Sequence, residues 1–363
     1  MRGCTIMGIG GGGYPELGLK ALAGALDEGL TLEWIDADEV AADAWTAVVY
    51  ETGTMAQPTP ETKAAIERLG FKPRLAGKEM ETALRELADY AGVTLGAVVP
   101  AELGGDSVAF PFVAAARLGL PIVDGDLCGR AVPEEMQGTP FLFEKDIHPI
   151  ACVDQWGNVC ILKETANFQA TERIQKMLSV AAFGSFHLAD TLLPGREMKE
   201  ILIRDTLTYS LDLGTAVREA RERGDDMVQA IVDFTSGWLL FTGEVERKEW
   251  EDRDGYLWGT TYIKGTGESS GQSFRCWFKN ENHIGWLDDE PVITTPDLPA
   301  IVDLETGEGK VNTFIDAGDP VAVIGIKGPE VFRSERGLSG SGPRYFGFDI
   351  DYVPIEERMA ATK

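Results

Sequence analysis

The stretch ELGGDSVAFPFVAAARLGLPIVDGDLCGRAVPEEM, residues 102–136, decides the fold class. A Gly-Gly turn opens a helix of small residues, and a short apolar strand follows at residues 120–123. Asp124, Asp126, Arg130 and Glu134 then come within eleven residues of one another. Polar groups this dense, directly after a buried strand, are typical of a ligand site at the carboxyl edge of a parallel sheet.

The sequence on either side of this stretch repeats the alternation of strand and helix. Amphipathic segments predict helices at residues 59–69 and 79–90, and short apolar runs predict strands at residues 4–7, 32–35, 47–50 and 95–98. Strands that alternate with helices form a mostly parallel sheet covered on both faces. We therefore expect a three-layer α/β domain over residues 1–165.

The pattern changes near residue 165. Helices are expected at residues 171–182 and 215–223, and short strands then dominate, at residues 238–246, 255–263, 273–278, 311–314 and 321–326. Several short strands separated by Gly, Asp and Asn turns suggest a small barrel or sandwich. Residues 166–363 are thus predicted to form a mainly β, barrel-like domain with some helix, which covers the site of the first domain.

Composition narrows the possible partners. A chain of 363 residues is long enough for two domains. Its net charge of −26 argues against nucleic acid and anionic membranes, which attract clustered Lys and Arg. Five cysteines without a Cys-x-x-Cys pair, and the lack of a signal-like run or of about 18 consecutive apolar residues, suggest the cytoplasm. A homo-oligomer is the ordinary expectation for such a protein.

A glycine-rich loop near the amino end is the next candidate. Gly10, Gly11, Gly12 and Gly13 follow the first predicted strand and precede Pro15, which suits the first turn of a helix. Their backbone N–H groups are predicted to face a substrate. The letters also satisfy the dinucleotide fingerprint, but four consecutive glycines match it in almost any register, so no nicotinamide cofactor is expected. A tight turn without a ligand is the alternative.

The residues after the 120–123 strand are the main catalytic candidates. Asp124 and Asp126 are a carboxylate pair that can divide acid and base roles or hold a divalent cation. Arg130 suits an anion, since a guanidinium matches a carboxylate, and Glu134 is a candidate acid. The alternatives are structural: the aspartates cap helices or turns, and Arg130 pairs with Glu134 one helical turn away.

Two further segments complete the predicted site. Glu102, Gly104 and Gly105 follow the 95–98 strand and place a carboxylate and free backbone donors at the same sheet edge, or else form a helix entry. Asn280, Glu281 and Asn282 are unusual in a strand-rich region, because such residues disfavour strands. They are predicted either to line the site from the second domain or to form a turn between strands.

Metal content is left open. The three histidines, His148, His187 and His283, show no ligand-like spacing, so no metal ligands are assigned, although a divalent metal is possible.

Four segments also resemble a known family, the S-methyl-thiohydantoin desulfurases. These are the 102–136 stretch, GIGGGGYPELG at residues 8–18, FKNENHIGW with TTPDLPAIVDLETGEG at residues 278–309, and GPRYFGFDIDYVPIEER at residues 342–358. The resemblance implies an α/β domain followed by a barrel-like one. It also implies hydrolytic removal of sulfur, as a thiol, from a thiohydantoin-type ring to give a hydantoin.

The residues leave other functions open. One is a different hydrolase, or an accessory subunit, that acts on hydantoin or oxoproline-like lactams. Another is a non-catalytic protein that binds a small molecule, or a nicotinamide enzyme built around the glycine loop. Because the three loops of the first domain each follow a predicted parallel strand, they should converge at one pocket under all of these readings.

Overall fold

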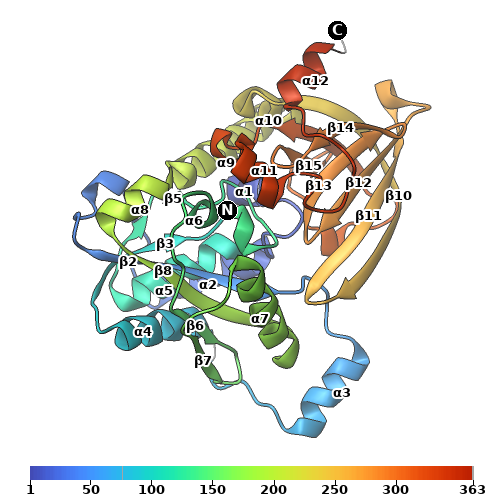
Figure 1. Cartoon of the computed structure of the whole chain (residues 1–363). Helices are drawn as coiled ribbons and strands as arrows, with labels where there is room; N and C mark the ends of the chain where they lie inside the picture. The colour runs from blue at the N-terminus through green and yellow to red at the C-terminus, as the bar shows by residue number, and fades with distance from the viewer. Residues whose placement is uncertain (76, 362–363) are drawn as a thin grey trace.

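The computed structural model describes residues 1–75 and 77–361. Within them the chain forms two seven-stranded sheets and one two-stranded ribbon, β5(Gly125–Asp126) with β9(Ile203–Arg204). The first sheet and its helices form one half of the molecule and the second sheet the other (Figure 1).

The first sheet is parallel on one side and antiparallel on the other. Its order is β1(Trp34–Ile35), β4(Ile122–Val123), β3(Leu95–Pro100), β2(Trp45–Gly53), β8(Ser185–Pro194), β6(Ile150–Val153), β7(Val159–Leu162). The first four strands pair in parallel, and the last three pair antiparallel to their neighbours. β2 is buried over most of its length, which explains its continuous apolar run.

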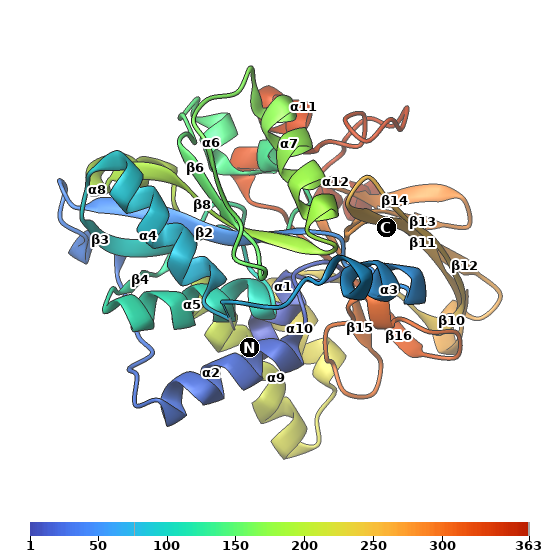
Figure 2. The same cartoon turned by 90° about the horizontal axis from the view of Figure 1, so that it is seen from below.

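Helices cover both faces of this sheet. One face packs against α4(Glu79–Ala91) and α5(Asp106–Leu118), with α2(Pro15–Asp27) outside α5. The other face packs against α7(Phe168–Ala181) and α8(Gly195–Ile201), so that α5 and α7 lie on opposite sides of β2 and β8 (Figure 2). This is the predicted three-layer domain. Its strand β8 and helices α7 and α8 follow residue 165, and the division at that residue stays a prediction.

The second sheet is antiparallel throughout and curls like half a barrel. Its order is β14(Glu290–Thr294), β13(Glu281–Leu287), β12(Ser273–Lys279), β11(Tyr256–Gly265), β10(Trp238–Arg253), β16(Pro320–Ile326), β15(Leu298–Asp303). The curl brings β13 into contact with β15 across the sheet. Phe241, Phe274, Cys276, Ile301 and Val323 fill its interior. The mainly β second domain is therefore confirmed.

Three helices join the two halves. α1(Arg2–Met7) packs on α9(Thr206–Arg223) and β15, and α10(Met227–Thr235) packs on α9, β10 and β16. The remaining helices are α3(Pro60–Leu69), which buries none of its residues, and the short α6(Thr139–Leu142), α11(Glu335–Ser341) and α12(Ile355–Ala361).

Two predicted strands are wrong. Residues 4–7 lie in helix α1, and residues 312–314 form a turn of 3-10 helix. Residues 3–7 are all buried. Their short run therefore shows no alternation of buried and exposed positions, and periodicity cannot distinguish a helix from a strand here. The helix matters for function, because the glycine loop then follows a helix and not a strand.

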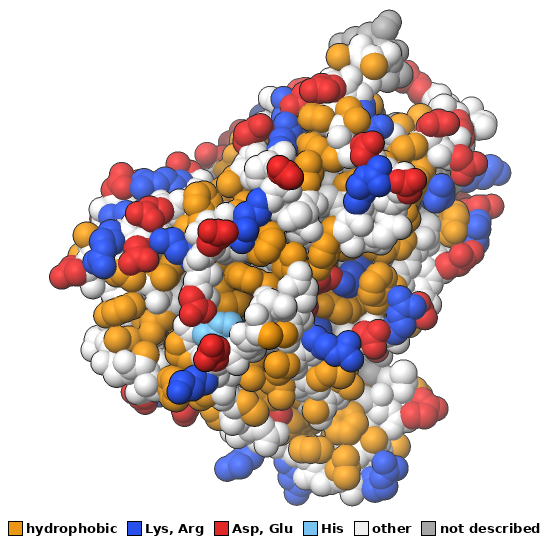
Figure 3. All heavy atoms as spheres, viewed as in Figure 1, with side chains coloured by type: hydrophobic (Ala, Val, Ile, Leu, Met, Phe, Trp, Pro, Cys, Tyr) orange, Lys and Arg blue, Asp and Glu red, His pale blue; other side chains and the backbone are white. Residues whose placement is uncertain are grey.

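The surface shows no concentration of basic charge on the face drawn in Figure 3, where Lys and Arg alternate with Asp and Glu. No helix in the described part of the chain is long and apolar enough to cross a membrane.

Candidate active site

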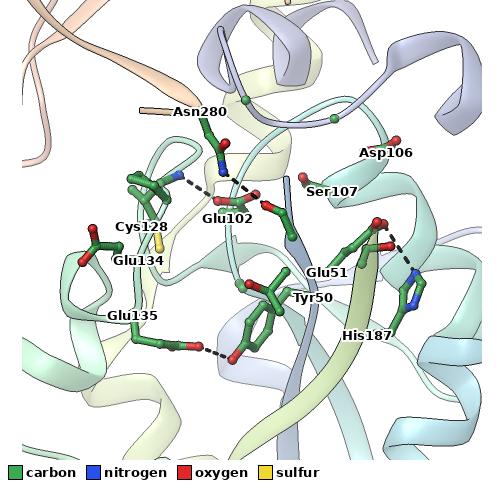
Figure 4. Close-up of a pocket in the computed structure, with 18 of the residues that line it drawn as sticks. Tyr50, Glu51, Glu102, Asp106, Ser107, Cys128, Glu134, Glu135, His187 and Asn280 are labelled. Atoms are coloured by element: carbon green, nitrogen blue, oxygen red, sulfur yellow. Dashed lines mark hydrogen bonds and ion pairs between the residues drawn. The ribbon is translucent and has the colours of Figure 1, made fainter. Parts of the chain in front are cut away.

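A cavity of about 360 Å³ lies at the carboxyl end of β2, between the two halves of the molecule. The three loops predicted to converge do meet there: Gly11 and Gly13, Glu102, and Cys128 all line it, together with Glu281 from the second sheet. Figure 4 shows the labelled side chains around this space. Nine carboxyl side chains line the cavity, but only two basic ones, Lys176 and His187. The carboxyl residues are Glu51, Glu79, Glu102, Asp106, Glu134, Glu135, Glu172, Asp190 and Glu281.

The glycine loop packs against residues of both domains. A Cβ on Gly11 would lie 2.0 Å from Oε1 of Glu281, and one on Gly13 would lie 1.3 Å from Oδ1 of Asp106. The backbone of Gly10 accepts a hydrogen bond from Asn312 N at 2.9 Å. These close approaches explain why side chains are absent here. The strand that a dinucleotide fingerprint requires before its loop is replaced by α1.

Three carboxyls that line the cavity have raised pKa values. Burial raises the pKa of Glu102 and of Asp106 to about 7, and that of Glu281 to about 8. Arg130 opposes the shift at Glu281, but desolvation is larger. Oε2 of Glu281 has no hydrogen-bond partner among the described residues, although this side chain is 2% exposed. A carboxylic acid in this position can donate a proton to a bound molecule.

An ion pair faces these acids from the sheet. Glu51 in β2 stands opposite His187 in β8, and Oε2 of Glu51 lies 3.4 Å from Nε2 of His187. Although burial opposes both charges, the pair lowers the pKa of Glu51 and raises the pKa of His187. Each partner thus favours the charged form of the other. It lies beside Asp106, whose pKa is raised partly by the Glu51 charge.

Glu134 also faces the cavity, but both of its oxygens are in use. Oε1 pairs with Nζ of Lys279, and Oε2 accepts a hydrogen bond from the Tyr345 hydroxyl. Lys279 lies 3.9 Å from the centre of the Tyr256 ring. Glu134 thus links the loop of the first domain to β12 and to the carboxyl-terminal segment.

Asp124 and Asp126 do not line the cavity. Asp124 accepts from the backbone N–H of Leu207 at 3.0 Å and of Thr208 at 3.1 Å, and so caps the amino end of α9. Asp126 accepts from Cys128 N at 2.6 Å and Gly129 N at 2.5 Å within its own turn. Burial raises the pKa of Asp126 to about 6. These contacts favour the capping alternative for both residues.

Arg130 is likewise turned away from the cavity. It is 4% exposed, and it donates to three backbone carbonyls: Ala131 at 3.1 Å, Asn282 at 2.7 Å and Asp297 at 3.4 Å. Its hydrogen bonds join the 124–130 loop to strands of the second sheet.

Only part of the Asn280–Asn282 segment lines the cavity. Asn280 and Glu281 line the cavity, at the tight turn from β12 into β13. Asn282 is fully buried, and its side chain donates to Pro299 O at 3.1 Å and accepts from Asn312 Nδ2 at 2.9 Å. Gly104 and Gly105, which follow Glu102 in the chain, pack against the backbone of residues 12–15.

The described His, Cys, Asp and Glu side chains do not form a metal-binding cluster. Within residues 1–75 and 77–361, no group of three or more His, Cys, Asp and Glu side chains is arranged to hold a metal ion. Burial raises the pKa of the Cys128 thiol well above its ordinary value, which disfavours the reactive thiolate.

Three acids that line the cavity were not among the predicted site residues. Asp190 lies on a strand, and Asp106 and Glu135 sit where helix starts favour acids in any case. A polar residue inside an otherwise apolar strand was the available signal, as in the segment SFHLADTLLP, which contains His187 and Asp190.

Two family models together match nearly the whole chain. The model described as S-Me-THD-like, N-terminal domain matches residues 1–164, and the one described as S-Me-THD-like, C-terminal domain matches residues 165–355. Among solved structures, an X-ray crystal structure of a protein from Chromobacterium violaceum matches with a TM-score of 0.73 and 20% identity. The match covers 98% of this chain and 96% of that chain, and at this identity it supports the fold alone. No curated protein matches the chain significantly.

Proposed function

The chain belongs to the S-Me-THD-like family, and on that premise we propose that it hydrolyses an S-methyl-thiohydantoin or a related thiohydantoin to a hydantoin. The observation that carries the proposal is the group of carboxyls with raised pKa values, Glu102, Asp106 and Glu281, around one cavity. The substrate is a five-membered ring whose C2 carries sulfur between two ring nitrogens.

The first step is activation of the ring. A carboxylic acid gives its proton to the ring nitrogen next to C2, and the resulting positive charge makes C2 a better electrophile. The acid becomes a carboxylate beside the cationic ring, which stabilises it. Glu281 is the group we assign to this step, because it lines the cavity and its pKa, about 8, is the highest of the three acids.

The second step is addition of water and loss of the thiol. Water oxygen forms a bond to C2 and loses a proton, which gives a tetrahedral intermediate. The C2–S bond then breaks, its electron pair leaves with sulfur, and a proton returns to give the thiol. As the C2 carbonyl forms, the C2 hydroxyl gives its remaining proton to the Glu281 carboxylate, which restores the acid. Glu102 and Asn280 face the same space and are assigned to hold the ring's polar edge. Of the other predicted residues, Glu134 is retained as a lining residue, whereas Asp124, Asp126 and Arg130 are not assigned to the reaction.

The test is thiol release from a synthetic S-methyl-thiohydantoin, measured with a thiol reagent together with loss of the ring absorbance. We expect turnover, and ¹⁸O from labelled water in the C2 carbonyl of the product. Hydantoin and 5-oxoproline are run in parallel. Turnover of either lactam without thiol release would favour the lactam-hydrolase alternative, and binding without turnover of any ring would favour a binding protein.

A matched pair of variants separates the pocket from general effects. Glu281→Gln keeps the size of the side chain but removes its proton donor, and it should slow thiol release. Glu290→Gln makes the same change at an exposed position of β14 and should not.

A further inference from the structure

A second arrangement in the cavity wall is not used by the steps above. The hydroxyl of Tyr50 lies between two carboxyl groups, Oε1 of Glu135 and Oδ2 of Asp190, the latter at 2.8 Å. Nε2 of Gln175 donates to the same phenol oxygen at 3.3 Å. Tyr50, Glu135 and Asp190 all line the cavity, and Figure 4 shows the Glu135–Tyr50 hydrogen bond beside it.

The fold holds the three groups together from separate elements. Tyr50 is two residues beyond Val48, the residue that pairs with Asp190, so the two side chains are diagonal neighbours on one face of the sheet. Glu135 comes from the loop after residue 130, and its backbone N–H is fixed by Oε2 of Glu172 at 3.1 Å. The geometry is therefore set by two strands and by helix α7.

These contacts indicate how the protons are distributed over Tyr50, Glu135 and Asp190. A phenol has one proton and can donate to only one carboxyl group. The other carboxyl oxygen within hydrogen-bond distance must bring its own proton, or two ionised groups would face the phenol oxygen. Asp190 already accepts a hydrogen bond from the Thr191 hydroxyl at 2.8 Å on its other oxygen, which suits the ionised form. Glu135 is then the protonated partner.

The surrounding charges agree with this assignment. Burial and the neighbouring Asp190 and Glu172 raise the pKa of Glu135 well above its ordinary value. Burial raises the pKa of Asp190 only to about 6, and the His148 side chain opposes that rise. Lys176 on α7 pairs with Glu172, with Nζ 3.8 Å from Oε1.

We propose that Glu135, Tyr50 and Asp190 form a proton relay that takes the proton of the attacking water and returns it to the departing sulfur. The relay rests on the proposed function. The second oxygen of Glu135 accepts the water proton, Glu135 passes its own proton to Tyr50, and Tyr50 passes its proton to Asp190. The water oxygen is bonded to C2 at the end of this step. When the C2–S bond breaks, the proton moves back along the same path to sulfur, and the relay returns to its starting state with Asp190 ionised.

The catalytic arm of the test uses Tyr50→Phe and Glu135→Gln. Each variant breaks the chain while it keeps the shape of the cavity, so kcat for thiol release should fall about 10²- to 10⁴-fold with little change in KM. Tyr256→Phe is the matched control, because Tyr256 is also a buried phenol bonded to a carboxylate, Glu172, but does not line the cavity. A kcat for Tyr50→Phe as high as that of Tyr256→Phe would overturn the relay.

The second arm needs no substrate, and it therefore separates failure of the relay from failure of the proposed function. Infrared difference spectra of the resting protein at pH 7 should show a protonated-carboxyl band that is lost in Glu135→Gln. The same band should remain in Glu134→Gln, whose residue is paired with Lys279. If Glu135→Gln removes no such band, Glu135 does not hold the proton and the relay is wrong, whatever ring the protein hydrolyses.

Discussion

Two groups of acids in this protein use their carboxyl oxygens differently. In the DGD loop, residues 124–130, Asp126 and Asp124 accept hydrogen bonds from nearby backbone N–H groups. The second group, Glu102, Asp106 and Glu281, lines the cavity, and burial raises the pKa of each. The density of acids along the chain therefore does not separate a structural loop from a reactive site. The position of each acid relative to the cavity does.

The first expected effect is on catalysis, at Glu102, which is assigned to hold the polar edge of the ring. Glu102→Gln keeps an oxygen that can accept the hydrogen bond from Val132 N, which is 2.8 Å long, but it loses the acid proton. Thiol release should fall by about 10- to 100-fold, which is the cost of one strong hydrogen bond to the ring. Thermal denaturation of the same preparation should show an unchanged or higher Tm. Nearly normal turnover would remove Glu102 from the proposed mechanism.

The next effect is on stability, at Arg130. Arg130→Met removes the side-chain donors to the backbone carbonyls of Ala131, Asn282 and Asp297, all in buried residues. We expect a loss of about 2–4 kcal/mol in the free energy of unfolding, measured in urea. KM of the folded protein should not change, because the side chain does not line the cavity. A raised KM at normal stability would show instead that Arg130 anchors the substrate.

Stability should also fall as the pH rises from 6.5 to 8.5. The pKa of Glu102 and Asp106 is about 7 and that of Glu281 about 8, all above their unfolded values, so the native state binds more protons in this window. The stability that these acids add is complete at low pH and is lost as the pH passes their folded pKa values. Below pH 6.5 the lowered pKa of His283 acts in the opposite direction, and above about pH 8 the lowered pKa of Lys279 does so too.

This pH dependence is measured as Tm in a series of buffers. Glu281→Gln should flatten the curve and be more stable than the wild-type protein at pH 8.5. A Tm that rises between pH 6.5 and 8.5 would contradict the protonated state of these acids.

The smallest effect is expected at Asp124. Asp124→Ala removes the cap from Leu207 and Thr208 at the start of α9 and should cost about 0.5–2 kcal/mol. Chemical denaturation measures this loss, and thiol release per folded molecule should stay close to normal. A large loss of turnover with an unchanged unfolding midpoint would return Asp124 to the active site.

The sequence predicts the layers and the meeting point of the loops well, because strand ends and helix starts have local signals. It predicted Glu102 and Glu281 as site residues, and both line the cavity. It did not predict Asp190, whose closeness to Tyr50 depends on the register between β2 and β8, strands far apart in the chain. The sequence also could not predict which way the Arg130 side chain points, because it donates to the carbonyls of Asn282 and Asp297, which are far away in the chain.

The most direct test of the account compares Glu281→Gln with Asp126→Asn. Both replace a buried acid of raised pKa by its amide, and only the Glu281 position faces the cavity. Thiol release from S-methyl-thiohydantoin and Tm are measured on the same preparations. The account predicts a turnover loss of about 10²-fold or more in Glu281→Gln and nearly normal turnover in Asp126→Asn. The reverse result, with Asp126→Asn inactive and Glu281→Gln active, would contradict it and place the chemistry in the DGD loop.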